Sequence, residues 1–317
     1  MQFHQAIKYI RKKVNMTQDE ISKGIVSRTS YSRFENGDRV LSISDIEKLA
    51  NRLGMQLSDI IDIQNEKNQV LLFITQQCKE AFAGNLDTED IEALYRYIDD
   101  LKDRSMTYLR YHYYVRQHFN HVSNLIPELS KKDTDHVYKE IKARKNITAI
   151  YLQFIIDFTA HFSDEQILDI STIFKDYDFR QISSLNSRYA HQLPDALFNL
   201  ADRSIDRATQ TTNQLKQDLI NNASEILETL ISYQRLKYSS DHVLLYRFSK
   251  YRLDYYKTEN NKLKQQAILN LREFLEELYY LKSKSPIRHV YAEECIKSIE
   301  NLLSGNGPSE VINYIIN

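Results

Sequence analysis

Four polar side chains fall on one arc of a short helix predicted near the N-terminus. They are Arg28, Thr29, Ser32 and Arg33. A helix turns by about 100° per residue, which sets this arc away from the two aromatic residues of the segment, Tyr31 and Phe34. An arginine guanidinium can donate two hydrogen bonds to N7 and O6 of guanine in the DNA major groove. The arc therefore favours base recognition, and an ordinary solvated helix face is the alternative.

Helix start and stop signals recur on both sides of this arc. Thr17 and Glu20 have the spacing of a capping box, in which the hydroxyl accepts a free backbone N–H and the carboxylate reaches back to the cap. Ser44 and Glu47 repeat that spacing, and Ser27 is a favourable N-cap. Helix exits are predicted where a glycine can close the last turn in the left-handed conformation. These glycines are Gly24, Gly37 and Gly54.

Apolar residues at helical spacing supply the expected core of this region. One stripe consists of Phe3, Ile7, Ile10 and Val14, and a second consists of Ile46, Leu49, Ala50 and Leu53. Tyr31 and Phe34 are expected to face the same interior. Together these patterns predict a five-helix unit over residues 1–63, in which two short helices joined by a tight turn form a helix-turn-helix.

Residues 17–37 read TQDEISKGIVSRTSYSRFENG and resemble the Cro/cI (XRE) class of DNA-binding domains. Within that class they are similar to Rgg-type regulators, where GI-x-S and S-x-FENG-like runs recur. The join between Lys23 and Ser27 is one residue shorter than in the class. The resemblance covers the predicted five-helix unit and implies that the unit binds DNA.

The same resemblance implies individual roles. The side chains expected at base edges are Arg28, Thr29 and Arg33, with Ser32 near the DNA backbone. The side chains expected at phosphates are Gln18, Asn36 and Arg39. Gln18 is also expected to brace the base-reading residues. Arg11 and Glu35 are expected instead to form an ion pair that ties the first helix to the third.

Charge supports a confined binding surface. Residues 1–40 contain eight Lys/Arg and four Asp/Glu, whereas the whole chain has a net charge of −1. A protein that coats nucleic acid non-specifically would be basic throughout. A small basic patch on a neutral chain fits a site-specific binder of double-stranded DNA that doubles its phosphate contacts by acting as a dimer.

Composition predicts an almost wholly α-helical chain of two domains. The sequence has 317 residues, 42% of them hydrophobic, with six Gly and four Pro, and no Pro precedes Pro127. No apolar run approaches the ~20 residues that cross a bilayer, and no export signal is evident. Cys78 and Cys295 are isolated thiols, so no disulfide framework is suggested and the cytoplasm is the expected compartment.

Beyond a polar linker at residues 64–69, the lengths of the predicted helices in residues 70–317 favour a TPR-like α-solenoid. The resemblance to Rgg-type regulators implies that this domain serves sensing and dimerisation. Breaks between helices are expected at several positions, one of them Pro194. The predicted helices lie near 70–82, 88–102, 105–123, 134–145, 147–161, 164–175, 178–191, 195–208, 212–237, 241–257, 261–282, 286–303 and 308–316.

Three polar residues interrupt apolar stripes in this second domain. They are Asn186, Asn222 and Arg247, and the aromatic residues beside them are Tyr189 and Tyr251. A buried amide or guanidinium needs a hydrogen-bond partner. The partner can be a neighbouring helix, or these donors can hold the backbone and carboxylate of an extended peptide. Both readings stay open from the sequence.

The layout as a whole resembles the Rgg/GadR/MutR family of transcriptional regulators. That resemblance rests on the length, the N-terminal XRE-type unit, the short linker, the helical remainder and the run that begins HVLLYRFSKYRLDYYKTEN at His242. It implies a cytoplasmic homodimer that binds a pseudo-palindromic operator and a short signalling peptide, as in quorum sensing. No cofactor, metal or enzymatic activity is indicated.

Two alternatives remain. One is an XRE-family repressor whose helical domain binds a protein or small molecule, or only dimerises. The other is a helical adaptor or phosphatase-like peptide sensor that does not act on DNA. The capped helix with its arginine-bearing face argues against the second.

Overall fold

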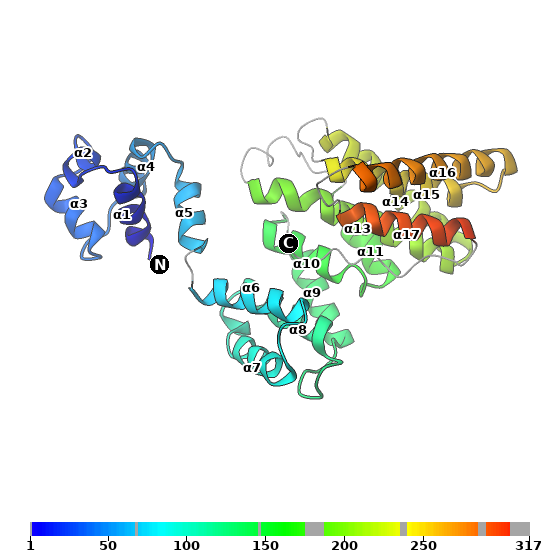
Figure 1. Ribbon diagram of the computed structural model, residues 1–317, viewed down its shortest axis with the longest axis horizontal. Coiled ribbons are helices and arrows are strands. Elements are labelled where there is room, and N and C mark those ends of the chain that lie inside the picture. Colours follow the sequence, from blue (N-terminus) through cyan, green and yellow to red (C-terminus); the bar gives the residue numbers. More distant parts are fainter. Residues whose placement is uncertain are drawn as a thin grey trace. The chain divides into compact units, whose positions relative to one another are not determined.

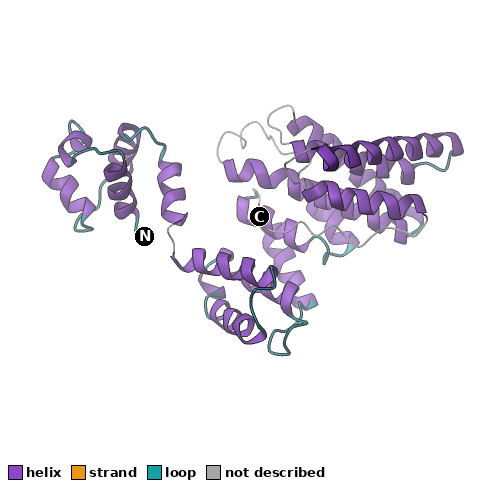
Figure 2. Cartoon of the chain, viewed as in Figure 1, coloured by secondary structure: helices purple, strands orange, loops and turns teal. Residues whose placement is uncertain are grey.

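The computed structural model describes residues 2–66, 69–144, 147–174, 187–234, 240–284 and 290–304. All regular secondary structure in these ranges is helical (Figure 2). Contacts divide the chain into two units, Met1–Pro127 and Glu128–Asn317. The predicted all-α fold class is therefore confirmed. In the described part of the chain, no helix is both long enough and apolar enough to cross a membrane.

Five helices form the N-terminal bundle of the first unit (Figure 1). They are α1 (Phe3–Lys13), α2 (Gln18–Ser22), α3 (Arg28–Glu35), α4 (Ile43–Arg52) and α5 (Leu57–Glu66). The five-helix prediction is thus correct. The last helix continues to residue 66, which places the first half of the expected linker inside α5.

The bundle has its own hydrophobic core. Its fully buried side chains come from every helix: Ile7, Ile21, Tyr31, Leu49 and Ile60. Burying one such side chain stabilises the fold by about 1.5–3 kcal/mol. Both predicted apolar stripes contribute, with one exception. Val14 follows the last residue of α1 and is 49% exposed, because the chain has already left the helix there.

Caps set the ends of the short helices. The hydroxyl of Thr17 accepts a hydrogen bond from the Glu20 N–H at 3.2 Å, and the Glu20 carboxylate accepts one from the Thr17 N–H at 2.6 Å. Ser27 caps α3 through a single bond of this kind, in which its hydroxyl accepts from the Ser30 N–H at 3.2 Å. Gly24, with φ of +72°, closes the end of α2 as predicted.

The predicted cap at Ser44 is wrong. Helix α4 begins two residues earlier, and the hydroxyl of Ser42 accepts a hydrogen bond from the Asp45 N–H at 3.1 Å. Leu41, which precedes this cap, and Ile46, four residues after it, both pack into the bundle core. These are the two positions of a hydrophobic staple, and burying both side chains in the core favours a helix that starts at Ser42. The spacing of Ser44 and Glu47 could not reveal this.

Three α-helices and a short 3₁₀ turn follow in the first unit. They are α6 (Gln69–Phe82), α7 (Thr88–Asp99), η1 (Lys102–Arg104) and α8 (Met106–Phe119). The described helices of the second unit are α9 (Lys131–Lys142), α10 (Ala149–Phe158), α11 (Asp164–Thr172), α13 (Ser187–Gln210), α14 (Asn213–Gln234), α15 (Ser240–Lys257), α16 (Asn261–Lys284) and α17 (Val290–Ser304). Within this unit α13 packs against α10, α14 and α15, and α16 packs against α15 and α17, so neighbouring helices bury one another's apolar faces (Figure 1). Residues 178–186 and 308–316 of the predicted helices lie outside the described residues.

The predicted break at Pro194 is also wrong. Helix α13 runs from Ser187 to Gln210 and contains Pro194. A proline inside a helix removes one backbone hydrogen bond and costs about 3 kcal/mol. Here the apolar side chains that follow it are fully buried: Ala196, Leu197, Phe198, Leu200 and Ala201. Their burial against α10, α14 and α15 outweighs the local cost of the proline.

A buried ion cluster joins α13 to α15. The guanidinium of Arg252 donates to the carboxylates of Asp202 and Asp206, and none of the three side chains is more than 7% exposed. Arg252 also lies over the ring of Phe248, 4.9 Å from its centroid. Burial raises the pKa of Asp202 to about 6, although Arg252 opposes the shift. One guanidinium from α15 thus bridges two carboxylates of α13 in the interior of the second unit.

Candidate nucleic-acid interface

Helix α3 presents the predicted polar arc to solvent. Arg28, Thr29 and Arg33 are exposed and Ser32 is half-buried. Tyr31 and Phe34, on the other side of the helix, are buried in the bundle core. The residue types on the two faces match those expected of a helix that enters the major groove.

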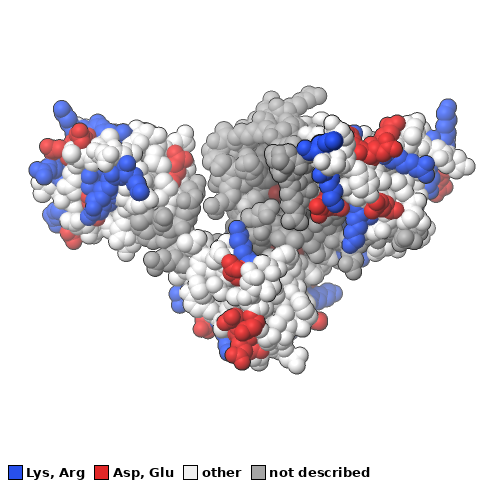
Figure 3. Space-filling view, viewed as in Figure 1, with Lys and Arg blue, Asp and Glu red and all other residues white. Residues whose placement is uncertain are grey.

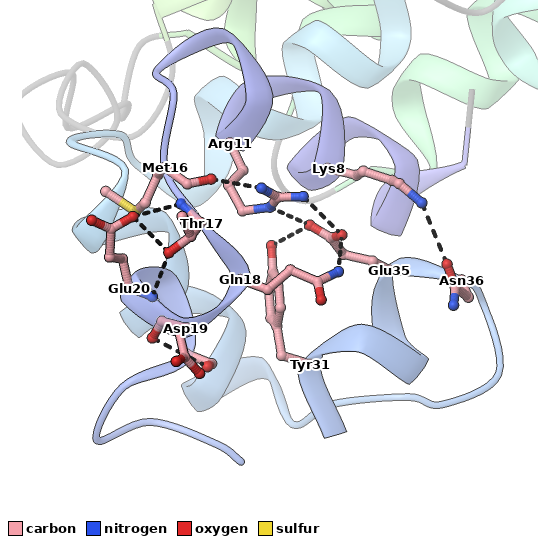
Figure 4. Close-up of polar contacts among 11 residues, drawn as sticks. Lys8, Arg11, Met16, Thr17, Gln18, Asp19, Glu20, Tyr31, Glu35 and Asn36 are labelled. Atoms are coloured by element: carbon pink, nitrogen blue, oxygen red, sulfur yellow. Dashed lines mark hydrogen bonds and ion pairs between the residues drawn. The ribbon is translucent and has the colours of Figure 1, made fainter. Parts of the chain in front are cut away.

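Glu35, the last residue of α3, is the centre of a buried hydrogen-bond network (Figure 4). Its carboxylate accepts two hydrogen bonds from Arg11 on α1, from Nε at 2.6 Å and from Nη2 at 3.1 Å. The hydroxyl of Tyr31 donates at 2.7 Å, and Nε2 of Gln18 on α2 donates at 2.8 Å. The expected ion pair between Arg11 and Glu35 is present, and the network ties three helices to one carboxylate.

The surroundings of Glu35 keep it ionised. Burial alone would raise the pKa of this carboxyl group, but the hydrogen bonds from Arg11, Tyr31 and Gln18 lower it below its ordinary value. The same contact raises the pKa of the Arg11 guanidinium. Burial, and then the neighbouring carboxylate, raise the pKa of Tyr31. The network therefore stays in one protonation state near neutral pH and holds α3 rigidly.

Gln18 lies half-buried at the first position of α2, where its amide is held by Glu35. This contact fixes Gln18 against the end of α3. The expected bracing of the base-reading side chains stays a prediction, as does the contact of Gln18 with phosphate. A side chain fixed in this way would meet a phosphate with little further loss of conformational freedom.

Other polar residues border the arc. The guanidinium of Arg28 lies 3.9 Å from Asp19 on α2, and both side chains are more than two-thirds exposed. Such a surface pair is worth about 0–1 kcal/mol, which leaves Arg28 able to turn toward a base. Asn36 and Arg39, expected at phosphates, are exposed just after α3.

Lys8 is a further polar residue of this surface that was not predicted from the sequence. Its Nζ donates to the Asn36 side-chain oxygen at 3.3 Å, which joins α1 to the end of α3. Lys8 lies three residues before Arg11, so both share one face of α1, and that spacing could have revealed it. Lys and Arg side chains gather on the N-terminal bundle in Figure 3.

The second set of predicted site residues is divided between helices. Asn186 and the side chain of Tyr189 lie outside the described residues. Asn222 on α14 is 5% exposed, and its amide donates to the hydroxyls of Ser171 on α11 and Ser204 on α13, at 3.1 and 3.0 Å. This is the internal pairing that the sequence left open as one reading.

Arg247 and Tyr251 lie one turn apart on α15 and are brought together. Nη1 and Nη2 of Arg247 meet the carboxylate oxygens of Glu277 on α16 at 2.9 and 2.8 Å. The guanidinium lies 4.7 Å from the ring centroid of Phe274 and 5.9 Å from that of Tyr251. Both side chains are half-buried, so part of each remains accessible to a ligand.

The second unit also contains a pocket of about 830 Å³ between α9 and α11. Its lining includes Tyr138 and Asp169, whose side chains hydrogen-bond to each other, and the buried Phe162. Arg207 of α13 also lines it. Asn222, Arg247 and Tyr251 are not among its lining residues, and no pattern in the sequence indicated the pocket.

Comparison with known proteins assigns the N-terminal bundle to a class. Residues 7–60 match the family model HTH_3, described as helix-turn-helix. The bundle is a helix-turn-helix domain. No curated protein matches the sequence.

Solved structures resemble the chain over almost its whole length. The SHP pheromone receptor Rgg2 of Streptococcus dysgalactiae matches with a TM-score of 0.68 and 9% identity, over 96% of this chain and 100% of that one. The structure of PrgX matches with a TM-score of 0.59 and 18% identity, over 97% and 96% of the two chains. The PrgX/cCF10 complex matches with a TM-score of 0.57 and 14% identity, over 99% and 97%. The chain therefore has the fold shared by Rgg2 and PrgX, a helix-turn-helix domain followed by a helical repeat-like region.

Proposed function

We propose that the protein is a sequence-specific DNA-binding regulator of transcription. The observation that carries this proposal is the exposed polar arc of α3. The buried carboxylate of Glu35 anchors this helix in the bundle through its bonds with Arg11 and Tyr31. Arg28, Thr29 and Arg33 would read base edges, and Ser32 would lie near the sugar–phosphate backbone. Gln18, Asn36 and Arg39 would contact phosphates. The helix-turn-helix match over residues 7–60 supports the same role.

We further propose that the helical remainder binds a short signalling peptide. Rgg2 is described as a pheromone receptor, and PrgX is solved in complex with cCF10. This chain shares their fold over nearly its full length. That supports a role for its N-terminal domain in DNA binding and for its helical remainder in peptide binding. The protein would then act in the cytoplasm as a homodimer on a pseudo-palindromic operator, and peptide binding would change its affinity for that operator.

Arg247 and Tyr251 are the described residues best placed for a peptide. A peptide carboxylate could replace Glu277 as the partner of Arg247, and the half-buried ring of Tyr251, packed edge-on against the buried Phe274, would offer an apolar contact beside it. Asn186 and the Tyr189 side chain stay predicted peptide contacts outside the described part of the chain. Asn222 is already bonded to two serines, so its part in the site would require those bonds to change. A ligand shifts an equilibrium only if it prefers one state. A peptide that takes Arg247 from Glu277 would prefer the state in which this ion pair between α15 and α16 is open.

The test combines DNA selection with peptide titration. Wild-type protein would be used to select binding sites from random duplexes, and mobility shifts on the selected site would then be repeated with candidate peptides. We expect Arg247→Ala to lose the peptide response and Glu277→Gln to strengthen it, with unchanged DNA affinity in the absence of peptide. Selection of no sequence would reject the DNA-binding role. A peptide response that ignores both substitutions would move the peptide site elsewhere.

The second candidate function is an XRE-type repressor whose helical domain binds a small molecule. The pocket of about 830 Å³ between α9 and α11 favours it, because that volume suits a small ligand. In that case DNA binding would respond to a small molecule, and substitution of Tyr138 rather than Arg247 would remove the response.

A further inference from the structure

The carboxyl end of α2 is closed by a side chain from α4. Nη1 of Arg52 lies 3.3 Å from the carbonyl oxygen of Glu20 and 3.0 Å from that of Ile21, and it donates to the carbonyl of Lys23 as well. Three carbonyls in the last turn of one helix thus share a single nitrogen. Arg52 lies 29 to 32 positions away from them in the sequence.

These are the carbonyls that the local backbone leaves available. The N–H of Lys23 bonds to Asp19, and the N–H groups of Ile25 and Val26 both bond to Ser22. A helix end that exposes its carbonyls needs other donors. A helix of five residues is also too short to be stable by itself. Arg52 therefore supplies, from another helix, the donors that complete the end of α2.

The same end of α2 leads directly into the recognition helix. Only the residues from Lys23 to Ser27 separate α2 from Arg28, the first residue of α3. Base readout requires side chains to be held within about 0.5 Å and 10–20° of their target geometry. Phosphate contacts are less demanding, because they carry no sequence information. The angle at which α3 leaves this turn therefore matters for specificity more than for affinity in general.

We propose that Arg52 is a positioning residue that fixes the turn between α2 and α3 for base recognition. The proposal rests on the DNA-binding function proposed above. Arg52 is exposed, but its Nη1 is engaged by the protein's own carbonyls. The proposal therefore gives Arg52 a role inside the protein, and contact of the guanidinium with a phosphate is the rival role that the experiment separates. The proposal predicts that loss of the side chain lowers discrimination between the operator and random DNA.

Two simpler roles for Arg52 make different predictions. If the guanidinium bound a phosphate, its loss would weaken binding to all DNA and reduce the salt dependence of binding by about one contact. If Arg52 only placed a positive charge in the last turn of α4, lysine would replace it fully. The ammonium group of lysine ends one bond short of Nη1, so we expect it to meet fewer of the three carbonyls.

The experiment compares Arg52→Met and Arg52→Lys with a matched control, Lys48→Met, in the full-length protein. Lys48 is an exposed basic residue on the same helix. For each variant, affinity would be measured on the site selected by wild-type protein and on random duplex at several salt concentrations. Hydrogen exchange of the backbone amides of Ile25 and Val26 would be followed without DNA.

We expect both Arg52 variants to bind the selected site roughly tenfold more weakly, the discrimination lost when one base contact is misplaced. Random DNA should be bound within about twofold of wild type, with an unchanged salt slope. The two amides should exchange faster, while Lys48→Met behaves as wild type.

Equal losses on both kinds of DNA with a shallower salt slope would overturn the proposal in favour of a phosphate contact. Wild-type behaviour of Arg52→Lys would overturn it in favour of a simple charge effect. If wild-type protein selects no DNA sequence, the proposed function fails separately. Unchanged amide exchange in the Arg52 variants would then still show that Arg52 does not hold the turn between α2 and α3.

Discussion

The exposed arginines of α3 carry the first prediction. Arg28→Ala and Arg33→Ala should each weaken binding to the selected operator by about 1–3 kcal/mol, because each removes one paired contact to a base. Mobility shifts on operators changed one base pair at a time would measure this. Each variant should lose discrimination at one position of the operator and keep it elsewhere. Arg39→Ala is the control, since loss of a phosphate contact should weaken binding to all sequences alike. Equal operator affinities for wild type and both arginine variants would rule out this assignment.

Glu35 carries the second prediction, which concerns acid. Its folded-state pKa is lowered, so the stability that it contributes is complete above its ordinary value of 4.5 and is lost as the pH falls through the folded-state value. Urea unfolding between pH 3 and 7 should show this loss in wild type. Glu35→Gln should be less stable at pH 7 by about 3–5 kcal/mol, because the buried charge of Arg11 loses its partner.

The same variant provides the control for the acid effect. Glu35→Gln has no carboxyl group to protonate at this position, so its stability should fall less steeply below pH 4.5 than that of wild type. Equal steepness in the two proteins would assign the acid transition to other carboxylates.

Helices α11, α13 and α14 meet at Asn222, the subject of the third prediction. Asn222→Ala leaves the hydroxyls of Ser171 and Ser204 without their shared amide in the protein interior. We expect a loss of about 1–3 kcal/mol in the free energy of unfolding without any peptide present. Thermal melting by circular dichroism would measure it, with Asn221→Ala, an exposed neighbour, as the control. Unchanged melting with a lost peptide response would make Asn222 a ligand residue instead.

At the scale of the whole molecule, we predict a homodimer. One chain presents one helix-turn-helix, and a two-fold pair would read half-sites about one helical turn apart or a multiple of it. Light scattering at micromolar concentration should give twice the mass of the 317-residue chain. Truncation after Ser285 should release monomers if the C-terminal segment supplies the contact. A monomeric full-length protein bound to a single half-site would contradict the prediction.

The sequence determined the N-terminal bundle because its signals are local. A cap acts on an N–H three residues away, a helix exit acts within its own turn, and an apolar stripe follows the period of one helix. Thr17, Ser27, Gly24 and the polar arc of α3 could therefore be assigned without knowledge of the packing. The ion pair between Arg11 and Glu35 came from resemblance to a known class rather than from spacing.

Tertiary structure alone decided the contacts that cross between helices. The start of α4 depends on the core that holds Leu41, and the passage of α13 through Pro194 depends on the helices packed around it. Asn222 reaches a serine 51 positions away, and Arg52 reaches carbonyls about 30 positions away. Such pairs depend on the crossing of two helices and on which face each presents there. Helical periodicity in a single sequence specifies the face but not the partner that covers it.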